Sequence, residues 1–286
     1  MPNGIYLIDK QQGDSSALAI AKLKHKLNIR KIGHAGTLDP MATGLLVCLT
    51  GQATKVMSYA LDGKKVYSGK FKLGLTSDTD DITGTLTVAE SFKGDTSQVI
   101  LASKNFIGEI AQVPPQISAV KIDGKRAYKR ARQGEEFEIS ARQVCVDSFE
   151  IAQVDDEYAF RITCSKGTYI RSIVRDLGVQ LGSGAVLSAL RREASLPFDI
   201  SMAKQIEALE TTDKLDWWAV FPQVQRLKLD EQALYKMLMG NKQSLQALEL
   251  NISDNLLLFC DSSGNPRGLL VKQNGQFEFG INFTED

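Results

Sequence analysis

The sequence has few of the residues that build metal or disulfide sites. Its 286 residues include only two histidines, His25 and His34, and four cysteines that lie far apart and form no Cys-x-x-Cys pair. Isolated cysteines of this kind are typical of reduced, buried thiols. The glycine patterns of phosphate-binding and dinucleotide-binding loops are also missing. We therefore expect chemistry by protein side chains alone, with no metal and no cofactor.

Long apolar runs are absent as well. No run of 18 apolar residues occurs, so a membrane span is not expected. The first four residues lead directly into a strand-like segment, without a basic or apolar leader, which predicts a cytoplasmic protein. The chain is 43% apolar, which is enough for a sizeable core, and its length predicts one large domain with a smaller one.

The chain also lacks a net charge, because 34 Lys and Arg residues balance 34 Asp and Glu residues. The basic residues nevertheless cluster. Residues 22–31 contain five of them and no acid, and residues 121–132 contain six against Asp123 alone. Such clusters are either phosphate contacts for a nucleic acid or solvated faces, and composition alone leaves both interpretations open.

The most informative segment is residues 33–44, which read Gly-His-Ala-Gly-Thr-Leu-Asp-Pro-Met-Ala-Thr-Gly. Pro40 disfavours the helical region for Asp39, and the glycines permit tight turns and close approach of a ligand. A carboxylate on a stiff loop near an imidazole suits a nucleophile or a general base. A Gly- and Pro-rich turn with an N-capping Asp would use the same residues, so residue types alone do not decide.

Hydrophobic periodicity predicts a mixed chain. A helix is expected to begin at Ser15 or Ser16, and others at 97–107 and 170–181. In the strand expected at 64–73, alternation turns Tyr67 inward. Further strands are expected at 5–8, 45–49, 85–89, 144–154, 158–164 and 186–192.

After Pro114-Pro115 the pattern breaks, and the segment to about residue 140 is interpreted as a basic insertion. Trp217 and Trp218 are interpreted as core or linker packing. The last 60 or so residues predict a small β-meander, with strands at 256–259, 269–272 and 277–281.

Six motifs in order resemble those of the TruB-type tRNA pseudouridine synthases. Besides residues 33–44, the similar stretches are 9–16, 65–67, 77–84, 114–121 and 164–171. They extend to about Pro197, roughly two thirds of the chain. The chain departs from the family pattern at Gln11, where the family has proline, and at Ser77, where it has threonine.

The resemblance implies an α+β fold. A catalytic domain at 1–228 would contain a large mixed, mainly antiparallel sheet flanked by helices, with an RNA-binding thumb inserted at about 108–142. Residues 229–286 would form a small β-rich, PUA-like domain. The implied activity is isomerisation of uridine 55 in the T-arm loop of tRNA to pseudouridine, by base flipping and aspartate-dependent cleavage and re-formation of the glycosidic bond. The T-arm is then the expected partner, and a monomer is the expected state.

The same resemblance assigns three catalytic residues. Asp39 would be the nucleophile, and Arg171 would pair with its carboxylate. Tyr67 would stack on the flipped base and remove the C5 proton, although a Tyr pKa near ~10 makes it a poor base without assistance. Whether Asp39 attacks C6 of the base or assists departure of uracil from C1′ stays open.

The resemblance also assigns residues that bind substrate. His34 would occupy the space that the flipped base leaves. The remaining substrate contacts are expected from Tyr169, Leu190, Asp81 and Lys10. The RNA backbone contacts are expected from Lys125, Arg126, Lys129 and Arg130.

Two alternatives remain. One is an RNA-binding or tRNA-folding protein whose catalysis is secondary. Against it as the sole role stand intact Asp39, Tyr67 and Arg171. The other is a glycoside or nucleoside hydrolase with paired carboxylates, which the pairing of an acid with an arginine disfavours.

Overall fold

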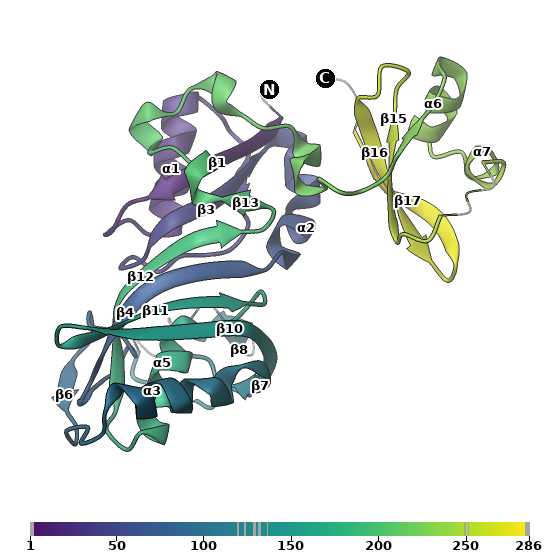
Figure 1. The fold of residues 1–286 in the computed structure, drawn as a ribbon. Coiled ribbons are helices and arrows are strands. Elements are labelled where there is room, and N and C mark those ends of the chain that lie inside the picture. Colours follow the sequence, from purple (N-terminus) through teal and green to yellow (C-terminus); the bar gives the residue numbers. More distant parts are fainter. Residues whose placement is uncertain are drawn as a thin grey trace.

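The computed structural model describes residues 3–118, 120–122, 124–127, 130, 133–135, 137–248, 250 and 252–283. Within them, a nine-stranded mixed sheet forms the larger body, and a four-stranded sheet forms a smaller body beside it (Figure 1). In the large sheet only β3 and β12 pair in parallel; the other pairs are antiparallel. The strand order is β1 (Gly4–Lys10), β3 (Thr43–Thr50), β12 (Ala185–Ser195), β4 (Lys65–Leu73), β11 (Glu157–Cys164), β10 (Arg142–Val154) and β7 (Gly108–Gln112), with β2 (Ile32–His34) on β3 and β13 (Phe198–Asp199) on β12.

Helices cover the two ends of this sheet. Helix α1 (Ser16–Leu27) begins at Ser15, whose hydroxyl accepts from the amide of Leu18, and it packs its apolar face on β1 and β3. Helix α5 (Ile170–Gln180) places the predicted stripe, from Ile170 to Leu177, in the core beneath β4 and β11. The sheet therefore carries one core at each end, and β4 and β12 cross the middle.

The helix expected at 97–107 is shorter than predicted. Helix α3 (Thr96–Ser103) ends at Ser103 and continues as a 3₁₀ turn, η2 (Lys104–Phe106). Ile107 is extended and Gly108 has φ +101°, so the backbone has left the helix before the β7 strand begins. The other short elements of this body are η1 (Gly51–Val56), α2 (Met57–Asp62), η3 (Ile200–Met202), η4 (Ile206–Ala208), η5 (Thr211–Asp213) and η6 (Trp217–Val220).

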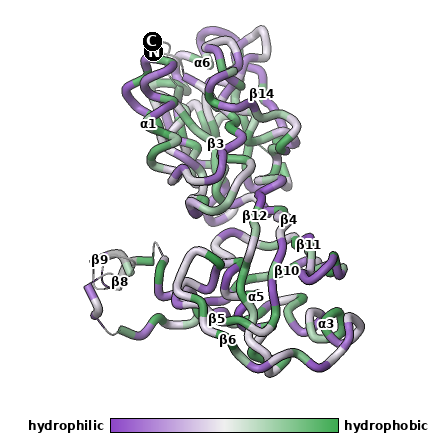
Figure 2. Tube along the Cα trace, turned by 90° about the vertical axis from the view of Figure 1, so that its left-hand side faces the viewer, coloured by the Kyte–Doolittle hydropathy of each residue, from purple (hydrophilic) through white to green (hydrophobic). Residues whose placement is uncertain are grey.

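Two hairpins leave the main sheet. One pairs β5 (Leu75–Ser77) with β6 (Leu86–Val88). Strand β6 lies within the strand expected at 85–89. The other pairs β8 (Lys121–Ile122) with β9 (Lys125–Arg126) and lies well away from the sheet (Figure 2). Strand β7 belongs to the sheet edge although it lies inside the predicted 108–142 insertion. The domain boundaries stay a prediction.

The smaller body contains the predicted meander, β15 (Leu256–Cys260), β16 (Pro266–Gln273) and β17 (Gln276–Asn282). Three elements were not predicted: β14 (Arg226–Lys228), which pairs in parallel with β15, and the short helices α6 (Glu231–Leu238) and α7 (Lys242–Gln246). Both helices are only one to two turns long, so periodicity hardly marks them, although Asp230 and Asn241 cap them.

An apolar cluster joins the two bodies. The ring of Trp217 stacks on Phe283 with centroids 3.9 Å apart, which confirms that Trp217 is a packing residue. The predicted α+β fold, with its mainly antiparallel sheet and β-rich C-terminal part, is confirmed. Across the described residues, every helix is too short or too polar to cross a membrane.

Candidate active site

A cavity of about 420 Å³ opens where β4 and β12 cross the middle of the large sheet. Its walls come from the loop after β2, from β4 and β12, and from the segment that starts α5. Six of the residues predicted from the sequence line it: His34, Asp39, Tyr67, Tyr169, Arg171 and Leu190. Segments far apart in the chain thus bring the predicted catalytic residues to one hollow.

The loop that carries Asp39 is fixed from two sides. Ser16, at the start of α1, donates its hydroxyl to the carbonyl of Leu38 and accepts from the Leu38 amide, at 2.9 and 2.8 Å. From β12, the guanidinium of Arg192 donates to the carbonyls of Gly36 and Leu45, which flank the loop. Gly36 has φ +107°, and a Cβ there would lie 3.3 Å from this guanidinium. The glycine therefore permits the close approach that holds the loop.

Arg171 faces Asp39 directly. Its Nε lies 3.0 Å from Oδ2 of Asp39, whose side chain is 35% exposed, whereas that of Arg171 is 4% exposed. Two backbone carbonyls fix the guanidinium, that of Thr79 at 2.8 Å and that of Ile117 at 3.0 Å. The arginine is thus held from several sides while the Asp39 carboxylate reaches the cavity, so the pair fixes the orientation of that carboxylate.

Asp81 lies behind Arg171 and outside the cavity wall. Its Oδ2 is 3.7 Å from Nη1 of Arg171, while its Oδ1 accepts from the hydroxyl of Thr79 and from the amide and hydroxyl of Thr83. The neighbouring Asp80 pairs instead with Arg175 at 3.0 Å. Of these two acids, Asp81 is therefore the one that supports the arginine of the site.

Tyr67 lies on β4, opposite Arg192 of β12, and its ring is buried. Burial raises the pKa of its hydroxyl, and the nearby Arg192 guanidinium acts in the opposite direction. A phenol with a raised pKa is protonated at neutral pH, so Tyr67 serves as a base only if another group stabilises its ionised form.

Tyr169 and Leu190 both line the cavity. The guanidinium of Arg142 lies 4.5 Å from the centre of the Tyr169 ring, and Gln112 accepts from the Tyr169 amide at 2.8 Å. Leu190 is buried on β12, and His34, which also lines the cavity, is the last residue of β2. These residues can present an apolar surface and a flat ring to a base.

Lys10 has a different place. It is buried at the end of β1, and its Nζ donates to the carbonyls of Gln11 and Asp14 at 2.9 and 2.7 Å. Burial lowers its pKa to about 8, against the attraction of Asp14 and Asp39. Lys10 is not among the residues that line the cavity.

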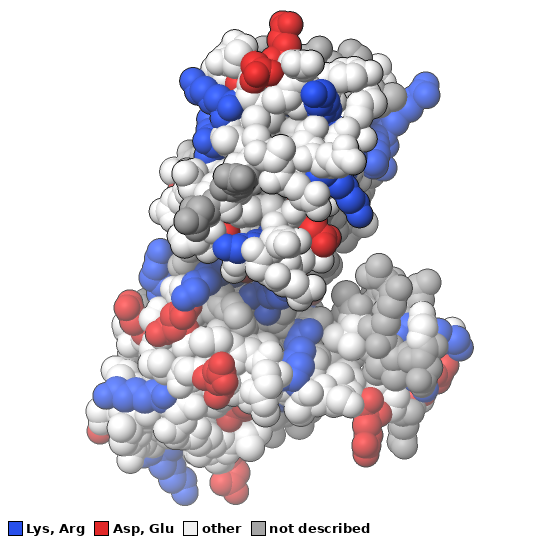
Figure 3. Space-filling model, turned by 90° about the vertical axis from the view of Figure 1, so that its right-hand side faces the viewer, with Lys and Arg blue, Asp and Glu red and all other residues white. Residues whose placement is uncertain are grey.

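The predicted backbone contacts are only partly described. Lys125 is exposed in the β8–β9 hairpin, and Arg126 lies in β9. Arg130 pairs with Glu135 at 2.7 Å and lies 5.1 Å from the ring centre of Phe137. Lys129 falls outside the described residues. On the face drawn in Figure 3, basic and acidic side chains are interspersed, and several basic ones gather near the middle of the molecule.

Sequence reasoning missed four basic residues of the cavity wall: Lys65, Arg142, Lys166 and Arg192. A signal existed for Lys65. Residues two positions apart on a strand share a face, and Tyr67 was expected to point inward, so Lys65 should point inward as well. Arg192 was expected only as part of a strand. Its entry into the cavity depends on the pairing of β12 with β4.

Comparisons with known proteins identify the family of this chain. The model of the TruB family pseudouridylate synthase, N-terminal domain, matches residues 24–170. The tRNA pseudouridine synthase B of Dinoroseobacter shibae is 44% identical over 74% of this chain and 70% of its own. Those of Syntrophotalea carbinolica and Opitutus terrae are 43% and 42% identical over 73% of this chain, and over 69% and 87% of their own.

Solved structures share the fold. A Cbf5–Nop10–Gar1 complex has a chain that matches with a TM-score of 0.71 and 22% identity, covering 99% of this chain and 84% of that one. An H/ACA RNP bound to a substrate RNA containing 2′-deoxyuridine matches with a TM-score of 0.71 and 20% identity, covering 99% and 86%. The family model and the relatives, which share more than 40% identity over about three quarters of the chain, show that this chain belongs to the TruB family of pseudouridylate synthases, which are isomerases.

Proposed function

We propose that the chain isomerises uridine 55 in the T-arm loop of tRNA to pseudouridine. The observation that carries the proposal is the Asp39 carboxylate, held 3.0 Å from a buried Arg171 at a cavity that also contains Tyr67. The relatives named tRNA pseudouridine synthase B support tRNA as the substrate. We expect the protein to act as a monomer in the cytoplasm.

The target uridine is stacked in a folded loop, so it must be extruded, which costs roughly a few kcal/mol. The cavity suits the flipped base, because Tyr67 and Tyr169 offer aromatic faces and Leu190 an apolar wall. His34, which also lines the cavity, would fill the space that the base leaves. Asp39, paired with Arg171, then brings about cleavage of the N1–C1′ bond by attack at C6 or by assisting departure of uracil.

Mapping pseudouridine in a T-arm stem-loop transcript tests the proposal. A single pseudouridine at the position of uridine 55 is expected after incubation with the protein, and none after substitution of that uridine by cytidine. Tight binding without any conversion would favour the alternative of an RNA-folding protein. Release of free uracil would favour a nucleoside hydrolase.

A further inference from the structure

In each of two pairs of neighbouring basic residues, Lys64 with Lys65 and Arg191 with Arg192, the first member is at least partly exposed and the second is buried and lines the cavity. Lys64 is 58% exposed and pairs with Asp147 at 2.7 Å. Lys65 is only 4% exposed, and its Nζ donates to the carbonyls of Leu61 and Gly63. The exposed lysine thus has a carboxylate partner, whereas the buried one has only backbone oxygens.

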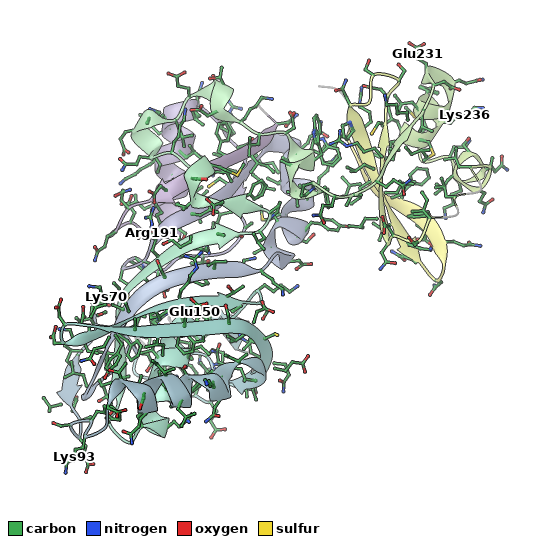
Figure 4. All side chains as sticks on the ribbon, in the orientation of Figure 1. Lys70, Lys93, Glu150, Arg191, Glu231 and Lys236 are labelled. Carbon is green, nitrogen blue, oxygen red and sulfur yellow. The ribbon has the colours of Figure 1, made fainter. Side chains whose placement is uncertain are left out.

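The arginines of β12 repeat this arrangement. Arg191, labelled in Figure 4, is 36% exposed and bonds both oxygens of Asp9 at 3.0 Å. Arg192 is 1% exposed, and its guanidinium donates to the carbonyls of Leu45, Gly36 and Thr37, at 2.7, 3.1 and 3.5 Å. No ion pair of Lys65 or Arg192 is found among the described residues.

Burying a cation without a counter-ion is unfavourable, because backbone dipoles replace only part of the lost hydration. Two such cations at one site need an explanation beyond folding. Both line the cavity, and Asp39, the one acid among the lining residues that the structure describes, is already paired with Arg171. The lining of the cavity therefore has an excess of fixed positive charge, which favours an anion.

We propose that Lys65 and Arg192 stabilise the negative charge that develops on the uracil ring during isomerisation. Their carbonyl partners hold them in place before the substrate arrives, so little reorganisation accompanies the reaction. The inference rests on the proposed function, since it assigns residues to the reaction of the same cavity.

Charge accumulates on the ring by either route. When uracil departs, the N1–C1′ bond breaks and its electron pair stays on the ring, spread over N1, O2 and O4. When Asp39 adds to C6 instead, the charge appears as an enolate at O4, the N1–C1′ bond breaks next, and the Asp39–C6 bond breaks again once C5 has bonded to C1′. In both cases C5 then bonds to C1′, the C5 proton leaves, and N1 gains a proton, so the overall reaction is an isomerisation. The cations act at the step at which the ring is most negative.

The test compares Lys65→Met and Arg192→Met with their matched controls, Lys64→Met and Arg191→Met. Single-turnover rates are measured on two T-arm stem-loops, one with uridine and one with 5-fluorouridine at the target position. Fluorine withdraws electrons and stabilises the ring anion by itself, and it removes the C5 proton that Tyr67 would abstract. Consumption of the target nucleoside is followed by chromatography after digestion of the RNA, and RNA affinity is measured in parallel.

We expect the two buried substitutions to slow uridine conversion on the order of 10²-fold, the range for losing one preorganised electrostatic group. The loss on 5-fluorouridine should be at least tenfold smaller, and the controls should stay within about threefold of wild type. Arg192→Lys, which keeps a cation, should recover part of the rate, and it replaces Arg192→Met if that variant does not fold. Equal losses on both substrates would overturn the proposal and leave a structural role. Failure of the wild type to convert the uridine stem-loop would instead refute the proposed function.

Discussion

Asp39→Asn and Asp81→Asn should separate catalysis from stability, because the two carboxylates contact the same arginine from different sides. In Asp39→Asn, Arg171 loses one partner but keeps Asp81 and the carbonyls of Thr79 and Ile117. The Asp39 side chain is partly exposed, so its ion pair is screened by solvent. The free energy of unfolding should fall by no more than about 1 kcal/mol. Loss of the nucleophile should reduce turnover on the order of 10⁴-fold or more.

Asp81→Asn should behave in the opposite way. The amide oxygen can keep the hydrogen bonds from Thr79 and Thr83, but the amide nitrogen would then face Nη1 of Arg171 in place of a carboxylate oxygen. The free energy of unfolding should therefore fall by about 2–4 kcal/mol. This value lies between the loss for an unmade hydrogen bond to a charged group and the loss for a broken buried ion pair. Turnover should fall only roughly 10- to 100-fold, because Asp39 and its loop stay in place.

Single-turnover pseudouridine formation and urea unfolding, followed by circular dichroism, measure the two quantities on the same samples. A mass-verified Asp39→Asn protein that still forms pseudouridine at a substantial rate would remove Asp39 from its role. Equal losses of stability in the two variants would refute the argument that Asp81 stabilises the position of Arg171 more than Asp39 does.

Three further outcomes are expected. Tyr67→Phe should keep its fold and RNA affinity but lose about two to four orders of magnitude in rate, as for a missing general base, and a near-normal rate would leave Tyr67 only a stacking surface. Lys125→Ala should lower the steepness of log affinity against log salt concentration by about one. Arg130→Ala should lower it less, because Glu135 already pairs with this arginine. Titration of RNA binding at several salt concentrations checks both. The rate should fall above about pH 8, because burial lowers the pKa of Lys65 to about 8 and the lysine then loses its proton. Lys65→Arg should remove that fall. If Lys65→Arg leaves the pH profile unchanged, the fall belongs to another group, such as Lys10. The charged or titratable groups that act on Lys65 are Arg192, Asp62, Cys164 and Lys166.

Local patterns in the chain were sufficient for much of the fold and for part of the site. Alternation in β4 turned Tyr67 inward, the stripe from Ile170 to Leu177 defined α5, and Ser15 marked the start of α1. These features follow from periods of two or 3.6 residues and from capping, which act over a few neighbours. The motifs around Asp39 and Arg171 were likewise visible in the sequence, whereas one- or two-turn helices such as α7 carry too few residues to show a period.

Sequence by itself therefore determined which side chains are available to the chemistry and which strand faces they occupy. Only the tertiary structure decided that Asp81 contacts Arg171 while Asp80 pairs with Arg175, and that Arg192 reaches the carbonyls of Gly36 and Thr37, about 155 positions earlier in the chain. The physical reason is that these contacts depend on the order and register of β3, β12 and β4 in the sheet. A shift of one residue in that register would turn Arg192 to the opposite face, where Arg191 now meets Asp9.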